Sequence, residues 1–247
     1  MFSEPGRGYD VAPTMFSPKG RLFQVEYAIE AVRKGALIVG AISQKDESVV
    51  LAAEKKLLPL QEEKYSGSEK IWIIDDHSIA AISGLTADAR VLIDHARLKA
   101  QIYKLSYDIP IGIEDIAKEI GDQCQYFTQF GGARPYGVSL LIGGIDPKKG
   151  PKLYNTDPSG SYWGFYACAV GSNYTAAKQI LEKKYNKDLT LEQILELCFE
   201  TLKGAMESEF NPSNIDVAYI KKKDLVIKFL NNDEKKDIIN KMIKNNI

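Results

Sequence analysis

The chain is poor in the residues that build metal sites and disulfides. It has two histidines and three cysteines among 247 residues. Neither His77 nor His95 has a partner at the spacing of metal ligands, so we expect no metal site. The cysteines are odd in number and widely spaced, at positions 124, 168 and 198. This pattern indicates free thiols in a reducing compartment.

Long hydrophobic runs and nucleotide-binding motifs are also missing. No window approaches the roughly eighteen apolar residues of a membrane-spanning helix, and the start MFSEPGRGYD lacks the apolar core of a secretory signal. Neither GxxxxGK[ST] nor GxGxxG occurs. Lys and Arg (32) nearly balance Asp and Glu (33), which disfavours a nucleic-acid or membrane-surface partner. We therefore expect an intracellular protein without a cofactor.

The N-terminal region predicts a loop-like arm followed by a helix. Residues 1–17 are rich in Gly and Pro and show no periodicity, whereas residues 21–34 predict a helix that Gly35 ends. Its apolar positions cover roughly 260° of the helical wheel, and a helix on one core needs a stripe of little more than ~100°. This helix therefore needs burial on two sides, either within its own domain or against another subunit. Those positions are Leu22, Phe23, Val25, Tyr27, Ala28, Ile29, Ala31 and Val32.

The rest of the chain predicts strands in runs and helices in pairs. Strands are expected at 37–43, 48–53, 70–74, 79–83, 138–145, 152–155, 165–170, 215–220 and 225–230. Helices are expected from 83–86 to about 105, at 113–130, 174–185 and 190–207, and in the tail at about 233–245. Thr190 and Gln193 form a capping box. This order predicts an α+β fold with two mainly antiparallel sheets between helix layers. We expect one domain over residues 18–247, preceded by the arm.

Several segments resemble those of α-type proteasome subunits. They are YDVAPTMFSPKGRLFQVEYAIEAVRKG (9–35), SEKIWIID (68–75), SGLTADARVLID (83–94), YFTQFGGARPYGVSLLIGGID (126–146), DPSG (157–160) and AVGS (169–172). The resemblance covers residues 9 to 220 and implies the four-layer αββα fold of N-terminal-nucleophile hydrolases. It implies a seven-membered α ring, of one chain or several, that stacks on rings of catalytic β-type subunits. It leaves open an archaeal or eukaryotic lineage, and implies a cytoplasmic particle, also nuclear if eukaryotic.

The same resemblance assigns roles to individual residues. Tyr9, Asp10, Pro18 and Tyr27 match the cluster that holds the gate for substrates. Lys70 in SEKI matches the lysine that receives the terminal carboxylate of an activator tail. Gly35, Gly84 and Leu85 match residues that line the same pocket. For the ring interface we expect Leu22, Phe23, Val25, Ile29 and Val32.

The sequence argues against catalysis by this chain. The catalytic version of the fold needs an N-terminal Thr, Ser or Cys whose free amine acts as the base, and no Thr here follows a Gly at which cleavage would expose it. Lys55 and Lys56 lie near the position of a catalytic lysine, and we interpret both as exposed charges. A non-catalytic subunit that templates assembly, gates the particle and docks activators is the predicted function. The rivals are a threonine-type peptidase of the same fold, a small-molecule enzyme, and a free-standing assembly scaffold.

Overall fold

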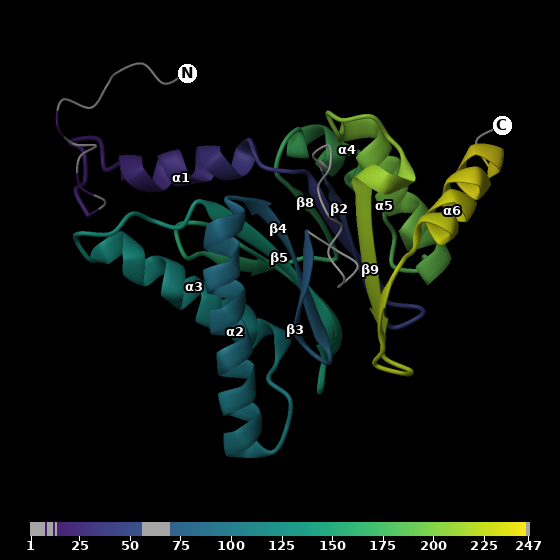
Figure 1. The fold of residues 1–247 in the computed structure, drawn as a ribbon, viewed down its shortest axis with the longest axis horizontal. Helices are drawn as coiled ribbons and strands as arrows, with labels where there is room; N and C mark the ends of the chain where they lie inside the picture. Colours follow the sequence, from purple (N-terminus) through teal and green to yellow (C-terminus); the bar gives the residue numbers. More distant parts are fainter. Residues whose placement is uncertain (1–7, 9–11, 13, 56–69, 246–247) are drawn as a thin grey trace.

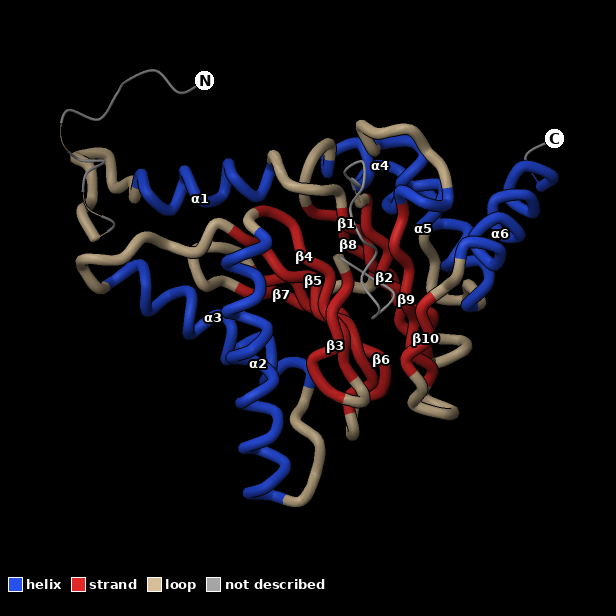
Figure 2. The backbone as a smooth tube through the Cα atoms, in the orientation of Figure 1, coloured by secondary structure: helices blue, strands red, loops and turns tan. Residues whose placement is uncertain are grey.

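Two five-stranded antiparallel sheets form the centre of the molecule (Figures 1 and 2). The computed structural model describes residues 8, 12, 14–55 and 70–245. One sheet has the order β10-β9-β2-β1-β8 and the other has β3-β4-β5-β6-β7. The first sheet contains β1 (Ile38–Ser43), β2 (Ser48–Glu54), β8 (Ala167–Val170), β9 (Ile215–Lys221) and β10 (Ile227–Phe229). The second contains β3 (Ile71–Asp75), β4 (Ser78–Gly84), β5 (Val138–Asp146), β6 (Gly150–Thr156) and β7 (Tyr162–Gly164).

Helices cover the outer face of each sheet. The sheet with β3 carries α2 (Thr86–Tyr107) and α3 (Ile113–Gln129), and the sheet with β1 carries α4 (Tyr174–Lys184) and α5 (Leu191–Ala205). The short helix η1 (Pro212–Asn214) leads into β9, and α6 (Asn232–Asn245) packs on α5. Three apolar clusters fill the spaces between these layers, one between the two sheets and one under each helix layer. The layers therefore follow the predicted order αββα.

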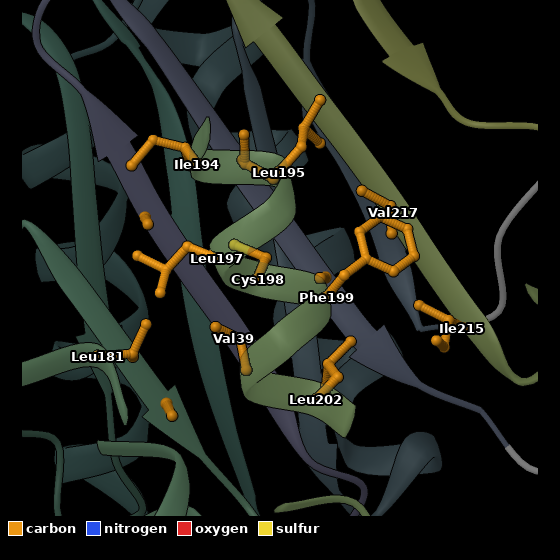
Figure 3. Packing of buried hydrophobic residues seen from close by; sticks show 14 of the residues in the cluster. Val39, Leu181, Ile194, Leu195, Leu197, Cys198, Phe199, Leu202, Ile215 and Val217 are labelled. Carbon is orange, nitrogen blue, oxygen red and sulfur yellow. The ribbon is translucent and has the colours of Figure 1, made fainter. Parts of the chain in front are cut away.

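Burial of the central strands on both faces fixes the register in which they pair. Every residue of β1 and β2 is buried, and the two strands pair in register from Ile38 with Ala53 to Ser43 with Ser48. Side chains alternate between the inner cluster and the cluster under α5, as the pleat of a strand requires. On α5, Phe199 is fully buried against β9, beside Val217 (Figure 3). Each such side chain stabilises the fold by about 1.5–3 kcal/mol.

The helix α1 (Phe23–Arg33) lies apart from the two helix layers. It crosses one end of the sandwich, next to β4 and β5, in Figure 1. It begins two residues later and ends one residue earlier than predicted. Its capping residue Lys34 is followed by Gly35, whose amide donates to the carbonyl of Val32 (2.8 Å). The tail helix and the capping box of Thr190 with Gln193 are confirmed.

One strand was not predicted, and the next was predicted to begin too early. The strand expected at 165–170 is found as β8, which begins two residues later, whereas β7, in the other sheet, was not expected. The chain crosses from one sheet to the other at Phe165 and Tyr166, both partly exposed. The second difference is at Leu225, which takes a left-handed conformation (φ 52°) and ends the turn before β10. An L-residue in that region belongs to a turn, so the strand starts later.

No helix in the described part of the chain is both long and apolar enough to cross a bilayer.

Candidate functional site

The residues matched to the activator pocket gather at one end of the sheet that contains β4. A Cβ added to Gly35, just after α1, would lie 2.3 Å from the backbone nitrogen of Gly84. Gly84 itself has φ +110°, and a Cβ there would lie 2.2 Å from the carbonyl oxygen of Gly137. Any larger residue at either position must push these backbones apart. The structure thus brings together two of the predicted pocket residues through direct backbone contact.

Leu85 extends this contact and presents an exposed side chain. It is the N-cap residue of α2, and its amide donates to the carbonyl of Gly137 (2.9 Å). The side chain is 46% exposed. Ser83 fixes the neighbouring end of α1, because its hydroxyl donates to the carbonyl of Ala36 (2.8 Å). This end of the sheet therefore combines a hydrogen-bonded backbone with an exposed apolar side chain.

Lys70 lies on the adjacent strand edge, immediately before β3. Its carbonyl accepts from the amide of Ile82 (3.0 Å), which places it two residues along the register from Gly84. Two residues along a strand span about 6.6 Å and neighbouring strands lie about 4.8 Å apart, so the Cα atoms of Lys70 and Gly84 lie about 8 Å apart. Lys70 is partly exposed. Its amide donates to Oδ2 of Asp216 (3.1 Å), a residue of the opposite sheet.

Lys55 corrects the sequence interpretation. It is 8% exposed, and its Nζ lies 3.2 Å from Oδ1 of Asp216. The interpretation as an exposed charge is therefore wrong for Lys55, and Lys56 lies outside the described residues. A buried ammonium is stable only with a partner, and Asp216 supplies it. In the sequence, Asp216 is a carboxylate between apolar residues at the start of a strand. The sequence alone assigned it no role.

A second ion pair holds the loop that supports Leu85. The guanidinium of Arg134 makes two hydrogen bonds to the Asp88 carboxylate, from Nη1 to Oδ2 (2.6 Å) and from Nη2 to Oδ1 (2.8 Å). The amide of Gly137 also donates to Oδ2 of Asp88 (2.8 Å). These hydrogen bonds, with that from Arg134 largest, lower the pKa of Asp88 below its usual value. Neither residue was singled out from the sequence, although both lie in the quoted segments.

The predicted gate cluster is only partly described. Tyr9 and Asp10 lie outside the described residues. Pro18 lies in an exposed turn, where the amide of Gly20 donates to the carbonyl of Ser17 (2.8 Å). Tyr27 is 46% exposed on α1 and stacks on Phe23 with ring centroids 6.3 Å apart. Its exposure leaves the phenol accessible to a partner.

The predicted ring-interface residues of α1 fall into two groups. Val25 and Val32 are buried within this chain, so they offer little surface to a neighbour. Leu22, Phe23 and Ile29 keep part of their surface exposed. Ile29 also lines a cavity of about 660 Å³ together with residues of β8 and α4. The face with Val25 and Val32 accounts for one of the two sides of the helix, and its own domain covers it.

Metal or thiol chemistry finds little support in the described residues. Within them, no group of three or more His, Cys, Asp or Glu side chains has metal-binding geometry. Burial raises the pKa of Cys124, Cys168 and Cys198 to about 12. All three thiols are thus protonated at neutral pH, and a thiol is a weak nucleophile.

Comparisons with known proteins find a family and named relatives that resemble this chain. Residues 32–220 match the proteasome subunit family, and residues 9–31 match the N-terminal signature of A-type proteasome subunits. Three similar proteins are each named as a proteasome alpha subunit. That of Archaeoglobus fulgidus is 47% identical over 235 residues, covering 95% of this chain and 94% of the relative. That of Methanocaldococcus jannaschii is 50% identical over 238 residues (96% and 89%), and that of Pyrococcus horikoshii is 46% identical over 245 residues (98% and 91%).

Proposed function

The chain belongs to the proteasome subunit family as an α-type member, and on this premise we propose that it docks activator tails and gates the particle. It is a non-catalytic α-ring subunit of the 20S core particle and assembles with other proteasome subunits. We infer further that it lacks the nucleophile, since no Thr follows a Gly in the sequence. The particle is proposed to work in the cytoplasm, and also in the nucleus if the source is eukaryotic.

The contact between Gly35 and Gly84, with Lys70 two residues along the register, is the observation that supports docking. An activator tail of the type hydrophobic–Tyr–any residue ends in a carboxylate. The Lys70 ammonium would pair with that carboxylate, while the exposed side chain of Leu85 would contact the apolar part of the tail. A hydrogen bond between charged groups contributes about 1.5–3 kcal/mol when it is partly shielded from water. The backbone contact keeps the pocket wall from shifting when the tail arrives.

The Lys70→Ala substitution tests docking. In a particle whose α ring contains this chain alone, we expect half-maximal stimulation of peptide hydrolysis to require about tenfold more activator. This factor corresponds to the low end of the free energy of a charged hydrogen bond. Assembly should persist, because the backbone bonds of Lys70 to Ile82 and Asp216 survive. Lys118→Ala is the matched control, since Lys118 is an exposed lysine on α3 that pairs with Asp122. Unchanged stimulation by Lys70→Ala would remove Lys70 from the site.

Ring closure is proposed to use the exposed face of α1. Leu22, Phe23 and Ile29 keep apolar surface on this helix, and Tyr27 lies beside them. A helix covered on one side by its own domain still needs a cover for the other side. An adjacent α-type neighbour in a seven-membered ring would supply that cover. The arm that precedes the helix, with Tyr9 and Asp10, would then gate the admission of substrates.

The rival functions differ in what the purified chain does. A threonine-type peptidase of the same fold would hydrolyse peptides without β-type subunits. A free-standing scaffold would assemble without incorporating them. No feature of the described residues favours either rival.

A further inference from the structure

One buried carboxylate joins the two sheets beside the proposed pocket. Asp216 lies on β9, is 1% exposed, and pairs in register with Ala53 of β2. Its Oδ1 lies 3.2 Å from the ammonium of Lys55, which directly follows β2 in the same sheet. Its Oδ2 accepts from the amide of Lys70, which precedes β3 in the other sheet, at 3.1 Å. Asp216 therefore holds both ends of the connection between β2 and β3.

The Lys55 ammonium stabilises Asp216 as a charged acceptor. A buried carboxylate without a counter-charge would take up a proton or destabilise the fold. Lys55 is held in turn by its own backbone, because its amide donates to the carbonyl of Asn214 (2.9 Å). With Lys55 beside it, Asp216 can stay buried at this position and accept from the Lys70 amide at 3.1 Å.

This bond fixes the point from which the Lys70 side chain extends. The amide of Lys70 is held by Asp216, and its carbonyl is held by Ile82 of β4. With both peptide groups fixed, the Cα of Lys70 stays at one distance from Gly84. The lysine stem is long and flexible and loses much rotamer freedom when its ammonium is bound. A fixed Cα reduces the volume that the ammonium samples before a tail arrives.

We propose that Asp216 is a positioning residue of the activator pocket, which sets through the Lys70 amide where the Lys70 ammonium meets the tail carboxylate. The inference rests on the proposed docking role of Lys70. It predicts that the acceptor at position 216 controls tail affinity even though the carboxylate itself is buried away from the tail.

Two double variants separate the effect of losing the hydrogen-bond acceptor at position 216 from the effect of leaving a buried charge. Replacing Lys55 by Met removes the ammonium and keeps the length of the stem, so Asp216 can then be changed without leaving an unpaired charge. In Lys55→Met with Asp216→Asn, the amide oxygen still accepts from the Lys70 amide. In Lys55→Met with Asp216→Ala, no acceptor remains. If the Ala variant does not assemble, Asp216→Ser replaces it, because its short side chain does not reach the Lys70 amide.

The assay is binding of a fluorescent peptide that ends in Leu-Tyr-Ala to assembled α rings of the full chain, with Lys70→Ala measured alongside. Native mass spectrometry confirms that each ring is intact. We expect the Asp216→Ala double variant to bind the peptide about tenfold more weakly than the Asp216→Asn double variant, which should bind within about twofold of the original chain.

The results distinguish the inference from the docking function on which it rests. Equal peptide affinity of the two double variants, with Lys70→Ala still weakening binding, would overturn the positioning role and leave docking intact. Unchanged binding by Lys70→Ala would overturn both. A purely structural role predicts equal affinities with different thermal stabilities of the rings.

Discussion

Removing Arg134 should destabilise the chain in a pH-dependent way. The Arg134→Met substitution keeps the apolar stem and removes both hydrogen bonds to Asp88. Asp88 is 8% exposed and keeps only the amide of Gly137 as a donor from this loop. Because the amide of Leu85 also donates to Gly137, the loss reaches the start of α2.

The geometry sets the size of this effect. Two charged hydrogen bonds to a buried carboxylate would contribute about 3 kcal/mol or more. The Arg134 side chain is 60% exposed, however, and solvent-exposed pairs contribute only about 0–1 kcal/mol. We therefore expect a loss of about 1–2 kcal/mol in the free energy of unfolding at pH 7.

The pKa of Asp88 gives the sign of the pH dependence. Arg134 lowers the pKa of Asp88 in the folded state below the unfolded value, which is about 3.9 for an aspartate. A lowered folded pKa stabilises the protein above the unfolded pKa, and this stabilisation is lost as the pH falls through the folded value. The difference between the original chain and Arg134→Met should thus be constant from pH 7 to pH 5 and shrink below about pH 4.

Urea unfolding of the full chain at a series of pH values measures this difference. The same substitution in an Asp88→Asn background should cost little at any pH, which gives the coupling energy of the pair. Lys118→Met is the control for an exposed pair and should cost under about 0.5 kcal/mol. A loss at Arg134 that does not depend on pH, or that persists in the Asp88→Asn background, would refute the reasoning.

Two further predictions concern the core and the arm. Phe199→Ala should lower the free energy of unfolding by about 3–5 kcal/mol, because Phe199 is fully buried on the inner side of α5. Urea unfolding measures this loss, with Leu105→Ala, at an exposed position, as the control. A loss under about 1 kcal/mol would contradict the packing in Figure 3. Deleting residues 1–12 should raise basal peptide hydrolysis by particles that contain β-type subunits, measured without activator. An unchanged basal rate would show that this arm does not help to close the gate.

The sequence predicted the regular elements well because burial imposes a period on them. The helices expected from 83–86 to about 105 and at 113–130 are found as α2 and α3, and their buried residues recur at helical spacing, from Ala89 to Ala100 and from Ile113 to Cys124. The prediction missed β7 and began β8 two residues too early for a physical reason. A continuous apolar run carries no mark of the point at which the chain leaves one sheet for the other.

The site was harder to predict than the fold. The contact between Gly35 and Gly84 joins residues 49 positions apart, and only the packing of α1 and the residues after it against β4 brings them together. Lys55 and Asp216 are separated by most of the chain, so nothing local in the sequence showed that one neutralises the other. The resemblance supplied Lys70 as a candidate. The residue that holds its backbone could come only from the structure.

Native mass spectrometry of the chain co-expressed with β-type proteasome subunits, and with any α subunits of the same source, tests the central claim most directly. The account predicts stacked-ring particles that contain this chain in the α rings together with β-type subunits. A chain that remains monomeric, or that forms assemblies without ever incorporating a β-type subunit, would contradict it.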